Sequence, residues 1–194
     1  MNRRELLAAM ADSGVNNRGI QLDISYPTDR VMVHMEGNKH HFKILPEQAY
    51  DYIHAGLTHL VTLAVRPELI YFGTLAQRSA RSAQALTALT RSNKAPHLLD
   101  IDLREPWYDT RTIKRSMKRA NMAKLNQEEL DTLALLFRLP GKNHQDKASA
   151  LVRRFALGSI LVPCGEQGAW QLDNKGKAVR IEEPAKTGRL VDTV

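Results

Sequence analysis

LLDIDLREPWYDTRTIKRSMKRANMAKLNQEEL, residues 98–130, contains two short apolar runs that each end on charged side chains. The first run, His97 to Ile101, predicts a buried strand, with Asp102 and Arg104 following its carboxyl end. A basic helix then leads to the second run, Asn121 to Leu125. Strand, helix, strand is the repeating unit of α/β sheets, and open α/β sheets bind ligands at the carboxyl ends of their strands. The stretch therefore predicts an α/β fold with a polar site at one sheet edge.

Hydrophobic periodicity places further elements on both sides of this stretch. Helices are expected at Arg3–Ser13, Pro46–His54, Arg78–Thr90, Asn126–Phe137 and Lys147–Ala156, and strands at Glu68–Phe72 and Ser159–Val162. Residues 20–44 alternate between apolar and polar positions and turn at Gly37, which predicts a small β-meander. Leu57–Val65 fits either helix or strand. We see no repeat or flexible linker, so one domain over residues 1–194 is expected.

The composition excludes several classes of protein. With 194 residues, 43% of them hydrophobic and 25% charged, the chain has enough material for one good core, and neither disorder nor a membrane span is expected. A single cysteine, Cys164, excludes an internal disulfide and a multi-cysteine metal site. The amino terminus has no apolar signal core, so a cytoplasmic location is expected.

The net charge of +7 raises the question of nucleic acid. Arg111, Lys114, Arg115 and Lys118 recur at helical spacing and form one basic face. Such a run is commonly only a solvated helix surface, and no aromatic residues are interleaved to stack on bases. We therefore favour a solvated helix surface and do not expect nucleic acid as a partner, with a basic nucleic-acid binder as the alternative.

Three histidines, His34, His40 and His41, lie close together in the predicted hairpin. Imidazole is a common metal ligand, but no carboxylate or thiol stands at a useful spacing. We favour an ordinary hairpin surface over a metal site.

Several motifs in a fixed order resemble the ribokinase-like (PfkB) sugar kinases, in particular the fructokinase and ketodeoxygluconate kinase branch. DIDLREPWYD resembles the D-x-N-x-R segment of that family, AKLNQEEL its K-x-N-x-x-E segment, and ILVPCGEQGAW its V-T-x-G-x-x-G-A nucleotide segment. The terminal VDTV looks like the start of its D-T-x-G-A-G-D signature. YPTDRVMV is similar to the β-lid region, here residues 20–44, and YFGTLAQRSARSAQAL to the strand and helix before the core motif.

This resemblance implies a three-layer Rossmann-like sheet with helices on both faces, a small β-lid, and transfer of a phosphoryl group from ATP to a sugar hydroxyl. It assigns Arg104, Asp102 and Gly73 to the sugar substrate or a phosphate. Lys124, Asn126, Glu129, Gly165 and Gly168 are assigned to the nucleotide, and Asn126 and Glu129, the latter through water, to Mg²⁺.

Some of these residues also have a purely structural interpretation, although the strand-end position of Arg104 favours a functional role. Arg104 could form a surface ion pair with Glu105 or Asp109, and Asn126 with Glu129 could form a helix capping box. Gly73 could serve a simple strand-to-helix turn. The sequence leaves these alternatives open.

The chain also departs from the family pattern. Asp102 stands where asparagine is usual, and Pro163 replaces a threonine, which removes a hydroxyl and a backbone N–H. Both changes bear on nucleotide affinity. The resemblance also implies that the chain is a fragment: it lacks the G-A-G-D part of the signature, which holds the family's catalytic aspartate, and the amino-terminal region with the sugar-binding glycines. We therefore expect an incomplete kinase domain with little turnover of its own.

Two other functions remain open. One is a non-catalytic nucleotide-binding or association module, in which uncovered apolar faces and sheet edges promote a homo-oligomer. The other is the basic nucleic-acid binder. Salt-sensitive retention on DNA or RNA, abolished by replacing Lys114, Arg115 and Lys118 together, distinguishes the latter.

Overall fold

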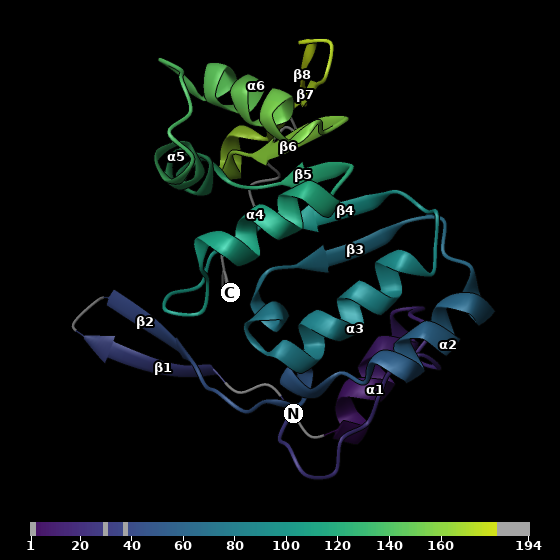
Figure 1. Ribbon diagram of the computed structural model, residues 1–194. Helices are drawn as coiled ribbons and strands as arrows, with labels where there is room; N and C mark the ends of the chain where they lie inside the picture. Colours follow the sequence, from purple (N-terminus) through teal and green to yellow (C-terminus); the bar gives the residue numbers. More distant parts are fainter. Residues whose placement is uncertain (1–2, 29–30, 37–38, 182–194) are drawn as a thin grey trace. The chain divides into compact units, whose positions relative to one another are not determined.

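A computed structural model describes residues 3–28, 31–36 and 39–181. These residues form two compact units, Met1–Ala95 with Arg104–Tyr108, and Pro96–Leu103 with Asp109–Val194. Figure 1 shows the order of elements along the chain. The α/β class predicted from the sequence is confirmed. Two compact units can belong to one domain, so the single domain over residues 1–194 stays a prediction.

The first unit combines a β-hairpin with helices. Its elements are α1 (Arg3–Asp12), β1 (Val31–Glu36), β2 (Lys39–Ile44), the 3₁₀ helix η1 (Ala49–Tyr52), α2 (Ala55–Val65), β3 (Ile70–Gly73), the 3₁₀ helix η2 (Leu75–Arg78) and α3 (Ala80–Arg91). β1 and β2 pair antiparallel, with Val31 opposite Ile44, so the predicted hairpin is confirmed. Helices α2 and α3 pack against each other, and Leu57–Val65 is helical.

The alternating pattern at Ile20 to Ile24 does not form a strand. The Asp23 carboxylate accepts the backbone N–H groups of Ser25 (2.7 Å) and Tyr26 (3.1 Å), and this turn breaks the extended run. The meander predicted for residues 20–44 is therefore wrong for its first strand, and the described residues of this region hold only the β1–β2 pair.

The helix predicted from Pro46 to His54 is shorter than expected. Glu47 has a positive φ of 56°, and the Asp51 carboxylate accepts the backbone N–H of Gln48 at 3.1 Å, so the helix starts at Ala49 instead. The carbonyls of Tyr50 and Asp51 then accept the hydroxyls of Ser82 and Ser79 rather than helical N–H groups. One 3₁₀ turn is the result.

The second unit is a sheet covered by helices. Its elements are β4 (His97–Asp100), α4 (Thr110–Arg119), β5 (Met122–Lys124), α5 (Gln127–Leu136), α6 (His144–Phe155), β6 (Ser159–Pro163), the 3₁₀ helix η3 (Gly165–Gln167), β7 (Ala169–Asp173) and β8 (Ala178–Ile181). Strands β4, β5 and β6 pair parallel, and β7 and β8 add antiparallel. The predicted strand–helix–strand stretch is confirmed.

Burial explains why these segments form this unit. Leu99, Ala123 and Ile160 are fully buried at matching positions of the three parallel strands. Ile113 and Met117, four residues apart on α4, are also fully buried, and α6 packs on β6 and β7. Apolar side chains that recur at helical spacing thus cover the apolar strands of the sheet.

Candidate functional site

The carboxyl ends of β4 and β5 carry opposite charges. Asp100 and Lys124 are register partners at the ends of these strands, and the Lys124 ammonium lies 2.7 Å from the Asp100 carboxylate. The Lys124 side chain is 40% exposed and that of Asp100 is 15% exposed. Both residues stand near the ends of predicted strands, but no local pattern in the sequence predicts their ion pair. The sequence signal that could have predicted this pair is that Asp100 and Lys124 stand at corresponding positions near the ends of two neighbouring parallel strands.

Glu129 joins the loop after β4 to the start of α5. One carboxylate oxygen accepts the backbone N–H of Leu103 at 2.9 Å, and the other accepts that of Asn126 at 2.9 Å. The Asn126 side-chain oxygen accepts the N–H of Glu129 at 2.8 Å. The capping-box interpretation of Asn126 and Glu129 is confirmed. The bond to Leu103 links two segments that no local pattern connects.

Asp102 lies in the same loop with a left-handed backbone. Its φ is +40°, a region that non-glycine residues rarely occupy and in which Asp and Asn are the most common exceptions. Fully buried Ile101 precedes it, and Leu103, held by Glu129, follows it. Such strained positions recur at ligand sites, which agrees with the predicted place of Asp102 at the sheet edge.

Gly165 and Gly168 lie in the hairpin loop between β6 and β7. Both have positive φ values, 59° and 79°, and the loop is closed by bonds from Cys164 N–H to the Gly168 carbonyl (2.8 Å) and from Gly168 N–H to the Gly165 carbonyl (3.1 Å). A Cβ atom at Gly165 would meet nothing within 4 Å. The glycines are therefore required by the turn itself, and the space outside the loop is open.

The other two predicted site residues belong to the first unit. Gly73 ends β3, and its carbonyl accepts the Gln77 side-chain amide at 2.9 Å, which is the strand-to-helix turn considered as the alternative. Arg104 is exposed. Of its two candidate ion-pair partners, Glu105 accepts the Tyr108 hydroxyl at 3.3 Å, and Asp109 caps α4.

A buried ion pair in the first unit was missed by the sequence analysis. Arg78 donates to both carboxylate oxygens of Asp51 at 2.8 and 2.7 Å and to the Leu45 carbonyl at 2.7 Å. Both charged side chains are 7% exposed, and the guanidinium lies 4.4 Å from the centre of the Trp107 ring. The hydrogen-bond partners of Arg78 are 27 to 33 residues away in the sequence, so no local motif predicts this cluster.

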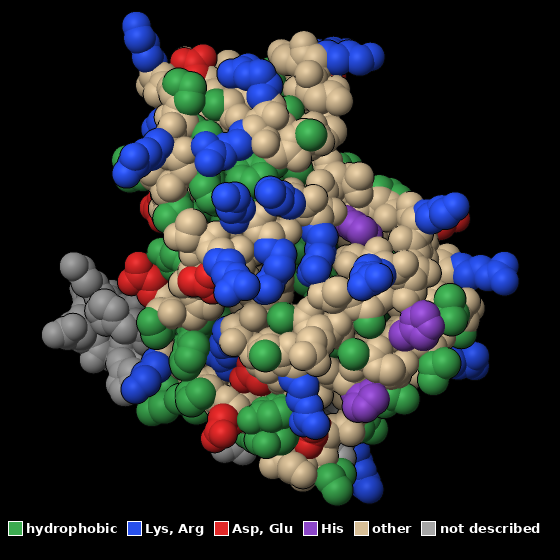
Figure 2. Space-filling view, viewed as in Figure 1, with side chains coloured by type: hydrophobic (Ala, Val, Ile, Leu, Met, Phe, Trp, Pro, Cys, Tyr) green, Lys and Arg blue, Asp and Glu red, His purple; other side chains and the backbone are tan. Residues whose placement is uncertain are grey.

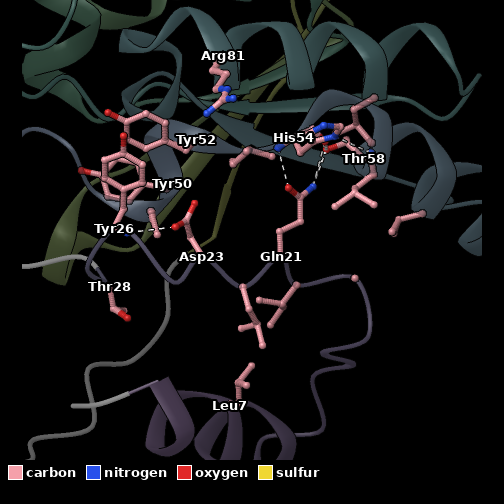
Figure 3. A pocket seen from close by; sticks show the side chains of 18 of the residues that line it. Leu7, Gln21, Asp23, Tyr26, Thr28, Tyr50, Tyr52, His54, Thr58 and Arg81 are labelled. Carbon is pink, nitrogen blue, oxygen red and sulfur yellow. Dashed lines mark hydrogen bonds between the residues drawn. The ribbon is translucent and has the colours of Figure 1, made fainter.

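The first unit holds a cavity of about 680 Å³, and Figure 3 shows the side chains that line it. Gln21 crosses it and bonds to the backbone of His54 and to Thr58. The rings of Tyr26 and Tyr52 stack at 3.5 Å, and the hydrogen bond between them raises the pKa of Tyr52 to about 12. The lining contains none of the predicted site residues.

Within the described ranges, 3–28, 31–36 and 39–181, no three His, Cys, Asp or Glu side chains come together as a metal-holding group. The backbone pairs His34 with His41, but the side chains of the three hairpin histidines lie outside the described part. None of the described helices has the length and hydrophobicity to span a bilayer.

Comparison with solved structures identifies the fold. The chain superimposes on a fructokinase with bound ATP from Xylella fastidiosa with a TM-score of 0.77, at 16% identity over 92% of this chain and 56% of that one. A PfkB protein from Polaromonas sp. JS666 gives 0.73, at 18% identity and with coverage of 92% and 62%. Aminoimidazole riboside kinase from Salmonella enterica gives 0.69, at 19% identity and with coverage of 93% and 58%.

These matches confirm the predicted ribokinase-like fold. The chain spans about three fifths of the length of the solved kinases. No protein-family model matches the chain, and no curated protein sequence does. The likeness is therefore one of fold, at low sequence identity.

Proposed function

We propose that the protein acts in ATP-dependent phosphorylation of a sugar hydroxyl, as a fructokinase-like sugar kinase. The observation that carries the proposal is the fold shared with a fructokinase that holds ATP, over 92% of this chain. The ion pair, the capping box and the glycine loop support it, because they lie at the strand ends or in the loop that follows a strand, where α/β folds bind ligands.

The proposed nucleotide residues are Lys124, Asn126, Glu129, Gly165 and Gly168. Lys124 would supply positive charge to phosphate oxygens, since its ammonium is partly exposed beside Asp100. The open space outside Gly165 leaves room for a ligand against the backbone. Asp102, Arg104 and Gly73 are proposed for the sugar or the transferred phosphate, with the Arg104 guanidinium suited to a bidentate contact.

The side chains of Glu129 and Asn126 could take part in holding Mg²⁺. Each Glu129 oxygen already accepts one backbone N–H, and a carboxylate keeps further lone pairs for water. Asn126 and, through water, Glu129 would hold Mg²⁺, an ion that commonly keeps several waters and takes few protein ligands. When bound, such an ion neutralises the charge of the transferred phosphoryl group.

Binding of Mg·ATP to the chain tests the proposal without requiring turnover. We expect Lys124→Gln to weaken binding about 10-fold, because it removes one charge-assisted hydrogen bond. Isothermal titration calorimetry measures the dissociation constant. Lys142→Gln is the matched control, since it removes the same charge from an exposed position in the second unit. Equal affinity of the wild-type, Lys124→Gln and control proteins would reject the nucleotide site.

Turnover is a separate measurement. A coupled assay of ADP release with fructose and related sugars tests the expectation that residues 1–194 alone turn over little. Binding of Mg·ATP without sugar-dependent ADP release would favour the non-catalytic nucleotide-binding module over the kinase.

We also propose that the chain self-associates through α2. Leu57, Leu60, Leu63 and Val65 are 49%, 62%, 50% and 65% exposed, and the helix AGLTHLVTLAV contains no acidic residue, lysine or arginine. An apolar helix face of this kind is normally covered. A second copy fits it, because two identical uncharged faces meet without charge repulsion.

A further inference from the structure

Helix α4 carries a stripe of positive charge that the proposed kinase function does not use. A surface hollow of about 420 Å³ is lined by five side chains, all of them cationic: Arg111, Lys114, Arg115, Lys118 and Arg119. Figure 2 shows lysine and arginine side chains gathered over this helix. None of the five is among the residues proposed for ATP or sugar. We call this set the α4 basic stripe.

The helix orients the stripe outward. Ile113 and Met117 bury the opposite side of α4 in the core of the second unit. The cationic positions are spaced by three and four residues, so they follow one side of the helix. From Arg111 to Arg119 the stripe extends over nine residues, a rise of about 12 Å at 1.5 Å per step.

The protein does not balance this charge with acids of the helix. Between Thr110 and Arg119 the sequence TRTIKRSMKR has no acidic residue. Asp109, which precedes it, is engaged by the N–H groups of Arg111 and Thr112 and by the Thr112 hydroxyl. Like charges four residues apart on a helix repel. Accordingly, burial and the neighbouring Arg115 lower the pKa of Arg119.

The side chain of Arg115 has a hydrogen-bond donor that is not satisfied within the described residues. Its Nε atom is buried and has no hydrogen-bond acceptor among the described residues. A buried donor without an acceptor is costly. Besides the hydrogen bonds from Thr112, the Arg115 charge also helps to lower the pKa of Asp109, and a guanidinium in this position can present its planar fork to a phosphate as well.

We propose that the α4 basic stripe binds the phosphate backbone of duplex nucleic acid without sequence preference. Each strand of a duplex carries one phosphate per ~3.4 Å of helix axis, so a stripe of about 12 Å laid along that axis spans about three phosphates of one strand. The absence of aromatic residues from α4 disfavours stacking on unpaired bases, which is why a duplex fits better than a single strand. Duplex DNA and duplex RNA share this backbone chemistry.

Fluorescence anisotropy with a labelled 20-base-pair duplex of mixed sequence tests the proposal. We expect duplex binding to weaken about 40-fold between 50 and 200 mM KCl, the slope for about three phosphate contacts. DNA and RNA duplexes in parallel show which backbone is preferred. A single strand bound more tightly than either duplex, or sodium triphosphate bound in place of both, would overturn the proposal.

Substitutions locate the contact. The triple variant Lys114→Gln, Arg115→Gln, Lys118→Gln should lose duplex binding at least 10-fold, whereas Lys142→Gln, Lys175→Gln, Lys177→Gln, with the same change of charge, should not. Equal losses in both variants would show a general charge effect and refute the stripe. If the first variant unfolds, Lys114→Gln with Lys118→Gln, both exposed, serves in its place and should still lower affinity and salt dependence.

Discussion

At the scale of residues, Arg78 shows how much one side chain contributes to the first unit. Its guanidinium satisfies the buried Asp51 carboxylate, a backbone carbonyl and the face of Trp107 together. Removing one partner of a buried ion pair leaves the other charge without compensation, which commonly costs about 3–5 kcal/mol.

We therefore predict that Arg78→Ala lowers the free energy of unfolding by about 3–5 kcal/mol. Urea titration followed by tryptophan fluorescence measures the change. Arg81→Ala, at an arginine that lies 5.8 Å from the Tyr52 ring, is the control and should cost less than about 1 kcal/mol. A loss for Arg78→Ala no larger than that of the control would contradict a structural role for the pair.

At the scale of elements, the start of α4 depends on one carboxylate. Asp109 accepts the N–H groups of Arg111 (2.8 Å) and Thr112 (2.9 Å) and the Thr112 hydroxyl (2.7 Å). These bonds, those from Thr112 above all, hold the pKa of Asp109 below its usual value. The ionised cap therefore stabilises the folded chain above the ordinary carboxyl pKa of about 3.9, and this stabilisation is lost as the pH falls through the lower folded pKa.

We predict that Asp109→Ala lowers the free energy of unfolding by about 1 kcal/mol at pH 7. The difference from wild type should shrink as the pH falls below 4. Asp109→Asn keeps a capping oxygen without the charge, so it should retain most of the stability and lose this pH dependence. Denaturant titrations from pH 3 to pH 7 measure both effects, and a difference that grows toward low pH would disprove the assignment.

At the scale of the whole molecule, the exposed face of α2 predicts self-association. Light scattering after gel filtration should give the mass of a homo-oligomer at tens of micromolar protein. We expect Leu60→Glu to return the chain to a monomer, because it places a charge in the apolar face.

Leu135→Glu is the matched control for this test. Leu135 is 82% exposed on α5, in the other unit, so the same substitution there should leave the oligomer intact. A monomeric mass for the wild-type chain across the concentration range would remove α2 as an interface.

By itself, the sequence determined the features that depend on neighbours along the chain. The strands and helix of residues 98–130, the capping box of Asn126 with Glu129, and the outward basic face of α4 each follow from residues a few positions apart. Periodicity and capping are local, so a pattern of residue types suffices to predict them. For the predicted site, this local information supplied the sheet edge at which Asp102, Lys124, Asn126 and Glu129 lie.

Only the tertiary structure decided the contacts between distant segments. Glu129 accepts the N–H of Leu103 from 26 residues away, and Arg78 meets Asp51 across 27 residues. Partner choice in such cases depends on which segments the folded core brings together, and many pairings satisfy the same residue types. The stretch at 98–130 therefore predicted where charges gather, and the fold determined which of them bond to one another.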